Sequence, residues 1–335
     1  EDEAGTLFLR LRKAATGHGV KVVAISSHTT RGLKKVNGEL IATVPGEEPA
    51  ALEALELDSS AVILAGERLA TVAGALSAVV AKAEATGARF AWVPRRAGDR
   101  SALDSGCLPT LLPGGRPVSL ADARADIAAA WNVPNVPDAA GLDTEAIIAA
   151  AAAGELGALV VGGVELADLA DPAAARAALE AVGFVVSLEV RQSEVTELAD
   201  VVLPVAPPAE KAGTFVNWEG RHRHFEKVLA DSAALPDVRV LAGIAEELGR
   251  PIGIKTTEQA AGELAELSDW DGKRAAFRSR KQAAAKAAAK KVVVSTWKQL
   301  IDDGRGQDGA EAYSATARAA ALRASAETLT AFAVE

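Results

Sequence analysis

Cysteine and methionine are almost absent from this sequence. The 335 residues include one cysteine, Cys107, and no methionine. A single thiol excludes a disulfide framework, a cysteine-based zinc site and an iron-sulfur cluster held by this chain alone, because a cluster needs about four thiolates. We expect Cys107 to be a small buried or half-buried loop residue, since no candidate base lies near it in the sequence. Because position 1 is Glu1, we expect a piece of a longer polypeptide.

Aromatic residues and long apolar runs are also scarce. Aromatics make up 4% of the chain, whereas hydrophobic residues make up 49% and charged residues 24%. No stretch approaches the roughly 18 uninterrupted apolar residues that a membrane helix needs. The sequence therefore predicts a soluble globular protein of about two or three domains, with cores of alanine and valine.

Positive charge is concentrated in one segment. The formal net charge is −9, but residues 273–291 hold eight lysines or arginines and no acidic residue, which leaves −17 on the rest. Phosphate contacts need a basic surface, so we expect no nucleic-acid binding by the folded part. The basic segment is rich in alanine and lysine and predicts an exposed helical linker. Binding of this segment to nucleic acid or anionic lipid is the alternative.

The motifs of several enzyme classes are missing. The sequence has no P-loop, no G-x-G-x-x-G after a strand, no G-x-S-x-G and no H-E-x-x-H. Gly162 and Gly163 stand between a predicted strand and a helix, where α/β sheets bind nucleotides, but a tight turn is favoured there. His222 and His224 alternate on one predicted strand and face one side. No third metal ligand is evident, so a basic exposed hairpin is favoured.

Short branched-aliphatic runs alternate with alanine-rich stretches, which predicts βαβ units and an α/β fold. We expect parallel strands, on one or two sheets, at residues 20–25, 61–64, 89–93, 158–162, 184–188 and 201–203. We expect helices at residues 7–16, ended by Gly17, at 70–86, 120–130, 143–153 and 237–248, and after the N-cap Asp171. Residues 26–35 and 94–118 show neither the periodicity of a helix nor that of a strand, so they predict loops.

Three further features follow in the second half. Residues 214–217 and 223–227 predict a hairpin that turns at Glu219 and Gly220. Thr256 and Gln259 suit a capping box at the start of another helix. Residues 292–295 predict a strand that opens a further domain.

Three segments resemble the molybdopterin-oxidoreductase superfamily. Residues 196–204 and 210–221 read TELADVVLP and EKAGTFVNWEGR, which is similar to a long and specific signature of that superfamily. Residues 93–117 resemble a stretch of the large subunits, the G subunits, of bacterial respiratory complex I, the NADH-quinone oxidoreductase. Residues 9–52 resemble a unit that supplies part of the cofactor's nucleotide pocket in molybdenum enzymes. Residues 296–309 resemble, more weakly, the entry to a C-terminal barrel domain.

This resemblance implies a fold and a domain order. It implies Rossmann-like parallel sheets followed by the start of a C-terminal β-barrel-like domain. Residues 1–58 would form part of a nucleotide-pocket-like α/β subdomain and residues 59–255 the molybdopterin-oxidoreductase-like domain. Residues 256–291 would be a helix and the basic linker, and residues 292–335 the truncated start of a further domain.

The sequence departs from the superfamily where the nucleotide of molybdopterin guanine dinucleotide would bind. Ser26, Ser27 and His28 replace an acidic residue and Pro-Arg, and Glu165 places a carboxylate where a pyrophosphate would lie. Like charges about 4 Å apart repel by about 1 kcal/mol even in water. We therefore expect no bound cofactor, no metal and no catalytic residue. The vestigial pocket candidates are Ser26, His28, Gly162, Gly163, Glu165, Gly213, Thr214, Asn217 and Arg221.

The second part of the signature is expected to be structural. Gly213 and Gly220 would permit turns that a β-carbon would strain, and Asn217 would hydrogen-bond loop backbone. Arg221 would form a buried ion pair with a carboxylate such as Glu210 or Glu219.

The implied function is that of a non-catalytic scaffold region in the large peripheral-arm subunit. The complex passes electrons from NADH through iron-sulfur clusters to quinone and pumps protons. The resemblance implies that the clusters lie in cysteine-rich N-terminal domains that this chain lacks. It also implies that the partners are other peripheral-arm subunits, at the cytoplasmic face of the bacterial inner membrane. The alternatives are a molybdenum oxidoreductase of formate dehydrogenase type and a free-standing nucleotide-binding protein.

Overall fold

The computed structural model describes residues 4–94, 98–273 and 309–315. The chain divides into two compact units, with residues 4–94 in the first and residues 98–273 in the second. The domain bounds expected at residues 58, 255 and 291 stay predictions. Within the described residues, no helix combines the length and the apolar character that crossing a membrane requires.

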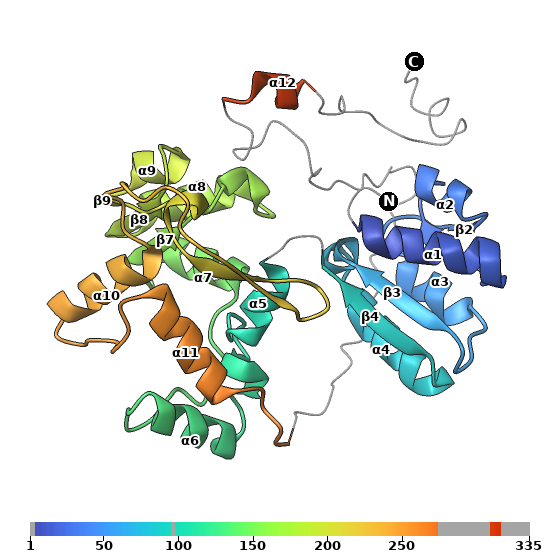
Figure 1. The fold of residues 1–335 in the computed structure, drawn as a ribbon, viewed down its shortest axis with the longest axis horizontal. Helices are drawn as coiled ribbons and strands as arrows, with labels where there is room; N and C mark the ends of the chain where they lie inside the picture. The colour runs from blue at the N-terminus through green and yellow to red at the C-terminus, as the bar shows by residue number, and fades with distance from the viewer. Residues whose placement is uncertain (1–3, 95–97, 274–308, 316–335) are drawn as a thin grey trace. The chain divides into compact units, whose positions relative to one another are not determined.

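The first unit is built on two pairs of parallel strands (Figure 1). β1 (Val23–Ser26) pairs with β2 (Glu39–Ala42), and β3 (Val62–Gly66) pairs with β4 (Arg89–Val93). Its helices are α1 (Gly5–His18), α2 (Arg31–Lys35), α3 (Glu48–Ala54), the 3₁₀ helix η1 (Glu67–Thr71) and α4 (Ala75–Thr86). Leu52, Ala65 and Val79 form the buried core. The expected crossover, in which α4 connects β3 to β4, is confirmed.

The first two expected boundaries need correction. α1 continues to His18 and is capped by Gly19, whose φ of 66° is left-handed, rather than being ended by Gly17. The following strand starts at residue 23 rather than 20, because the Val20 N–H donates to the Ala14 carbonyl (3.2 Å) and completes the helix end.

The remaining corrections in this unit concern short elements. The loop expected at residues 26–35 contains α2, which the Thr30 side chain caps by accepting the Leu33 N–H (3.1 Å). α4 starts at residue 75 rather than 70, because Gly74 precedes it with a left-handed φ of 77°. β2 was not predicted because its four residues carry no long apolar run.

The second unit contains a parallel sheet in the order β7-β8-β9 and two small antiparallel pairs. Its strands are β5 (Leu111–Leu112), β6 (Arg116–Pro117), β7 (Leu159–Gly162), β8 (Val185–Glu189), β9 (Val201–Pro204), β10 (Gly213–Val216) and β11 (His222–Phe225). Its helices are α5 (Asp99–Asp104), α6 (Ala121–Ala130), α7 (Thr144–Ala152), α8 (Pro172–Ala181), α9 (Glu194–Leu198), α10 (Asp237–Glu247) and α11 (Thr257–Leu267). The 3₁₀ helices η2 (Pro113–Gly115), η3 (Leu166–Asp168) and η4 (Pro208–Glu210) connect them. The remaining described element, α12 (Glu311–Ser314), does not belong to this unit.

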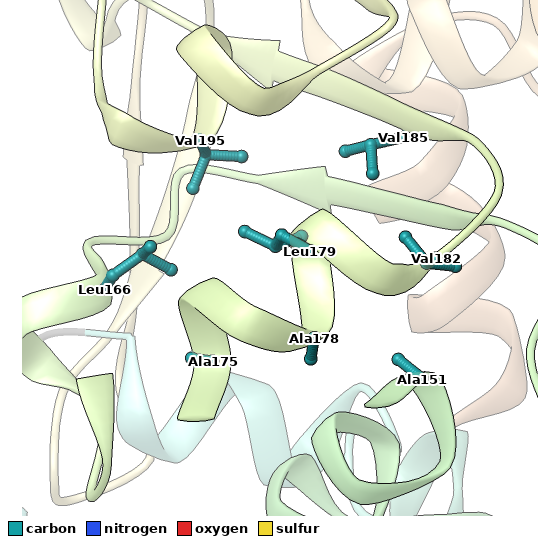
Figure 2. Packing of buried hydrophobic residues seen from close by; sticks show 8 residues of the cluster. All are labelled: Ala151, Leu166, Ala175, Ala178, Leu179, Val182, Val185 and Val195. Atoms are coloured by element: carbon teal, nitrogen blue, oxygen red, sulfur yellow. The ribbon is translucent and has the colours of Figure 1, made fainter. Parts of the chain in front are cut away.

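One hydrophobic core joins β8 to α7, α8 and α9 (Figure 2). Ala151 of α7 and Ala178 of α8 are buried where these two helices pack together, and their small side chains let the backbones approach closely. Leu179 and Val185 connect α8 to the sheet, and Val195 packs on them from α9. This core holds the sheet whose carboxyl edge carries several candidate residues.

Most of the expected architecture of this unit is confirmed. Asp143 and Asp171 accept the N–H groups of Ala146 (2.9 Å) and Ala174 (3.0 Å), as their N-cap positions predict. The Thr256–Gln259 capping box is also present. The α/β class and the parallel strands are confirmed, although these strands form three separate sheets rather than one or two.

Other expectations are wrong or lie outside the described residues. The long loop expected at residues 94–118 contains α5, β5, η2 and β6. Cys107 is exposed rather than buried or half-buried. Residues 274–291 of the expected linker, the strand at residues 292–295 and the truncated barrel-like domain, apart from residues 309–315, lie outside the described residues.

Candidate functional site

The carboxyl edge of the β7-β8-β9 sheet carries Gly162, Gly163 and Glu165. Gly162 ends β7, and Gly163 follows with a left-handed φ of 62°. The Gly163 N–H donates to the Leu188 carbonyl of β8 (3.1 Å). The Gly163 N–H therefore continues the parallel ladder between β7 and β8, and the chain bends at Gly163 as it leaves the sheet. The tight turn favoured from the sequence stays a prediction. Glu165 is half-buried and directly precedes η3.

Ser26 and His28 belong to the other unit of the chain. Ser26 is the last residue of β1, and its register partner on β2 is Ala42. The next two residues contact each other, because the Ser27 hydroxyl lies 3.2 Å from His28 Nδ1. These positions form a polar end to β1.

The β10-β11 hairpin carries Gly213, Thr214, Asn217 and Arg221. The Asn217 side chain accepts the N–H groups of Glu219 (3.0 Å) and Arg221 (2.9 Å). The backbone N–H of Asn217 donates to the Arg221 carbonyl (3.1 Å). Gly220 in the turn has a left-handed φ of 79°. The structural roles expected for Asn217 and Gly220 are confirmed.

Two other expectations for the hairpin are wrong. Gly213 lies within β10, and a β-carbon there would approach the Phe225 ring to 2.6 Å, so a close approach rather than a turn requires the glycine. Arg221 does pair with Glu219 (3.1 Å), but 62% of the Arg221 side chain is exposed. Such a pair contributes about 0–1 kcal/mol. Glu210 instead accepts the Ser232 hydroxyl.

The histidines of the hairpin lie as the alternation predicts. His222 and His224 pair with Val216 and Thr214, so both are on one face of the two-stranded sheet. His224 Nδ1 lies 2.7 Å from the Thr214 hydroxyl. Among the described residues, no group of at least three potential side-chain ligands is arranged to hold a metal ion.

The first part of the signature holds β8 and β9 in place. Thr196 and Ser193 form a capping box at the start of α9, with each side chain accepting the other's N–H. The Asp200 carboxylate then accepts the Val185 N–H at the start of β8 (2.7 Å). These polar side chains satisfy backbone groups at element ends.

A buried arginine that sequence reasoning missed organises the segment before α6. Arg116 is 4% exposed and donates to Asp126 (2.6 Å) and to the Pro113 carbonyl (3.0 Å). It also donates to the carbonyls of Leu267 (2.6 Å) and Ser268 (2.9 Å) at the end of α11. A cation is favourable at a helix C-terminus. No local pattern around Gly114-Gly115-Arg116 indicates partners about 150 residues away.

Comparisons with known proteins place the chain in a family. The family model described as molybdopterin oxidoreductase matches residues 2–233. The chain belongs to the molybdopterin oxidoreductase family. The G subunit of NADH-quinone oxidoreductase from Mycobacterium tuberculosis is 52% identical over 98% of the chain, and that from Streptomyces coelicolor is 47% identical over 98%. A nitrate reductase of Symbiobacterium thermophilum is 37% identical over 44% of the chain and 20% of its own length.

The family resemblance of the three segments is thus confirmed. The chain spans 42% of the length of both of these NADH-quinone oxidoreductase relatives. The matches to this family include relatives named as NADH-quinone oxidoreductase and relatives named as nitrate reductase or formate dehydrogenase. Whether the carboxyl edge of the β7-β8-β9 sheet can bind the cofactor therefore helps to distinguish these two kinds of family member.

The described sheet edge does not fit the pyrophosphate of a nucleotide-containing molybdopterin cofactor. Such a group needs N–H donors or cations, but the Gly163 N–H is already bonded to Leu188. The N-terminus of α8, which would attract an anion, is capped by the Asp171 carboxylate. Glu165 and the buried Glu189 add carboxylates at the ends of β7 and β8. The N–H groups of Gly163 and Ala174 are thus already bonded within the protein, so neither is available to a pyrophosphate.

Proposed function

We propose that this chain is a non-catalytic scaffold region of the large subunit of a bacterial NADH-quinone oxidoreductase. The observation that carries the proposal is the end of β7, where the Gly163 N–H is already bonded to the Leu188 carbonyl of β8 and Glu165 follows two residues later. The two relatives that match 98% of the chain, both named as G subunits of this oxidoreductase, support the assignment.

The proposed whole complex passes electrons from NADH to quinone and pumps protons. Its iron-sulfur clusters lie in a part of the large subunit other than this chain, which has one cysteine. The chain packs against that part and against other peripheral-arm subunits, at the cytoplasmic face of the bacterial inner membrane. Its contact with the membrane is indirect, through the complex.

The vestigial pocket positions are Ser26, His28, Gly162, Gly163, Glu165, Gly213, Thr214, Asn217 and Arg221. We propose that none of them binds a cofactor, a metal or a substrate. The use of signature side chains such as Asn217 and Asp200 to bond backbone groups supports this role. A fold that has lost its ligand but keeps these bonds can still serve as a scaffold if its surface is buried in interfaces with other subunits. A stable interface buries about 800 Å² on each partner.

The metal content of the purified intact complex tests this proposal. We expect iron in the amount that its clusters require, and molybdenum far below one atom per complex. A formate dehydrogenase of the same family, purified and digested in parallel, is the positive control for recovery of molybdenum. Stoichiometric molybdenum in the complex would favour the alternative of a molybdenum-dependent oxidoreductase of formate dehydrogenase type.

The mass of the native polypeptide is a second test. The scaffold proposal expects a polypeptide that continues into cluster-binding domains and copurifies with other subunits. A native polypeptide of only 335 residues, recovered without partners, would instead favour a free-standing nucleotide-binding protein.

A further inference from the structure

The β10-β11 hairpin presents an outer face that consists of Phe215, Arg223 and Phe225. Phe215 and Arg223 are direct cross-strand partners, and Gly213 pairs with Phe225 on the same face. Burial alternates along β10, because Val216 is 4% exposed whereas Phe215 is 47% exposed. On β10, Val216 therefore packs against the protein and Phe215 points away from it. On β11, His222, Arg223 and His224 are exposed and Phe225 is half-buried.

The outer face is preorganised rather than loose. The rings of Phe215 and Phe225 are stacked, with centroids 5.0 Å apart and an interplanar angle of 24°. Gly213 leaves the space that the Phe225 ring fills. Asn217 and Gly220 hold the turn that sets the register of the two strands. The aromatic pair therefore offers a fixed apolar surface, whose ordering costs little entropy on binding.

Arg223 adds an available charge to this surface. It is exposed, and its guanidinium Nη1 donates to the carbonyl of its neighbour His222 (3.0 Å). Among the residues that the structure describes, Arg223 has no carboxylate partner. A guanidinium in this setting is suited to a bidentate bond with a carboxylate. Aromatic residues and arginine are also the residues enriched at the energetic centres of protein interfaces.

The charge around the hairpin indicates the kind of partner. Residues 219–227 contain two arginines, two histidines and one lysine with two glutamates, one of which, Glu219, pairs with Arg221, in a chain whose net charge is −9. A local cationic surface on an acidic protein steers acidic protein surfaces towards it. The remainder of the chain would repel the continuous negative charge of a nucleic acid or an anionic membrane. The observations therefore favour a polypeptide with carboxylates set among apolar side chains.

We propose that the outer face of the hairpin is a docking surface for an acidic segment of a neighbouring subunit. A carboxylate of the partner binds the Arg223 guanidinium, and apolar side chains pack on Phe215 and Phe225. This inference rests on the proposed function, because it requires that the chain is part of a multisubunit complex.

The test uses the full-length polypeptide in its native complex. Arg223→Glu and Phe215→Ser are introduced separately, and the polypeptide recovered with the iron-containing complex is measured against wild type. We expect each variant to lower recovery about tenfold, as for central interface residues. Arg223→Lys keeps the positive charge but loses the planar guanidinium that can bind a carboxylate through two hydrogen bonds. It should lower the recovery less than Arg223→Glu does. Higher salt during purification should weaken the wild-type association.

A matched control separates docking from general effects of charge. Arg250→Glu makes the same charge change at an exposed residue after α10 and should leave recovery unchanged. Thermal unfolding of each purified polypeptide checks folding, and Arg223→Glu remains informative if Phe215→Ser fails to fold. Normal recovery of the Arg223→Glu variant with the complex would overturn the proposal that this face is a docking surface. Absence of the wild-type polypeptide from the complex overturns the proposed function instead.

Two further measurements address the other classes of partner. Wild type and Arg223→Glu are mixed with phosphatidylserine vesicles and with RNA. We expect neither protein to bind either probe at physiological ionic strength. Binding that Arg223→Glu abolishes, together with unchanged recovery in the complex, would assign the face to lipid or nucleic acid and overturn the proposal.

Discussion

Arg116 and Gly114 are the residues whose importance depends most on the folded structure. Gly114 has a left-handed φ of 74°, and a β-carbon on it would lie 2.2 Å from Arg116 Nη1 and 2.4 Å from the Ser268 carbonyl oxygen. The Arg116 guanidinium also lies 5.6 Å from the centroid of the Trp270 ring. The buried position of Arg116 thus requires glycine at position 114, because the space for the guanidinium exists only without a side chain there.

Gly114 and Gly115 give a matched test of this dependence. Both have left-handed φ values, 74° and 76°, but a β-carbon on Gly115 would meet no atom within 4 Å. Gly115→Ala should therefore lower the free energy of unfolding by about 1 kcal/mol, from backbone strain alone. Gly114→Ala should lower it by about 3 kcal/mol or more, because Arg116 must also leave its buried site. Urea unfolding followed by tryptophan fluorescence measures both, and equal losses would contradict this account of Arg116.

At the scale of elements, a side chain that caps the backbone marks three of the helix starts that the sequence predicted. Asp143, Asp171 and Thr256 mark the starts of α7, α8 and α11, and each accepts an N–H three residues later. α2 and α9 were missed although Thr30 and Ser193 cap them, because each has only five residues. α5 and β5 carry no such signal. They are short elements whose positions depend on packing with η2 and β6.

α10 is connected to the segment after it by an ion pair that makes a pH-dependent contribution. A hydrogen bond from the Lys255 ammonium is the main cause that lowers the pKa of Glu246 below its ordinary value of 4.5. Because the folded-state pKa is depressed, this contribution to stability is present above the unfolded-state pKa. It is lost as the pH falls through the lower, folded-state pKa.

Removing Lys255 tests this connection. Lys255→Gln should raise the pKa of the Glu246 carboxyl, measured by NMR titration from about pH 7 to pH 2. Lys21→Gln is the control, since Lys21 pairs with Glu39 (2.9 Å) in the other unit. It should leave the Glu246 titration unchanged. An unchanged Glu246 pKa in Lys255→Gln would show that another group lowers it.

At the scale of the whole molecule, the basic segment at residues 273–291 is predicted to be a linker. It carries eight like charges and no apolar anchor except Phe277, so it has little means of packing against a core. Deleting residues 283–290 should leave recovery of the assembled complex nearly unchanged. Deleting residues 258–265 of α11 should abolish it, because that helix ends at the Arg116 site. Loss of assembly with the first deletion would identify the segment as a docking element.

The sequence by itself determined the family, the α/β class, the parallel strands and the starts of α6, α7, α8, α10 and α11. These depend on contiguous residues, such as the apolar run in β8 or the bond that the Asp171 carboxylate accepts from the Ala174 N–H. The candidate positions at Gly163 and Asn217 could also be identified from motifs, and Asn217 has the local role expected. Such features are readable because their energy comes from groups only a few residues apart.

Only the tertiary structure decided which polar residues are buried and which glycines are indispensable. The bonds from Arg116 to Leu267 and Ser268 span 151 and 152 residues, and the need for glycine at position 213 comes from the Phe225 ring on a paired strand. The exposure of Arg221 and Cys107 was likewise not predictable. Each depends on which distant segment packs nearby, because burial and steric contact are properties of the folded chain rather than of a sequence window.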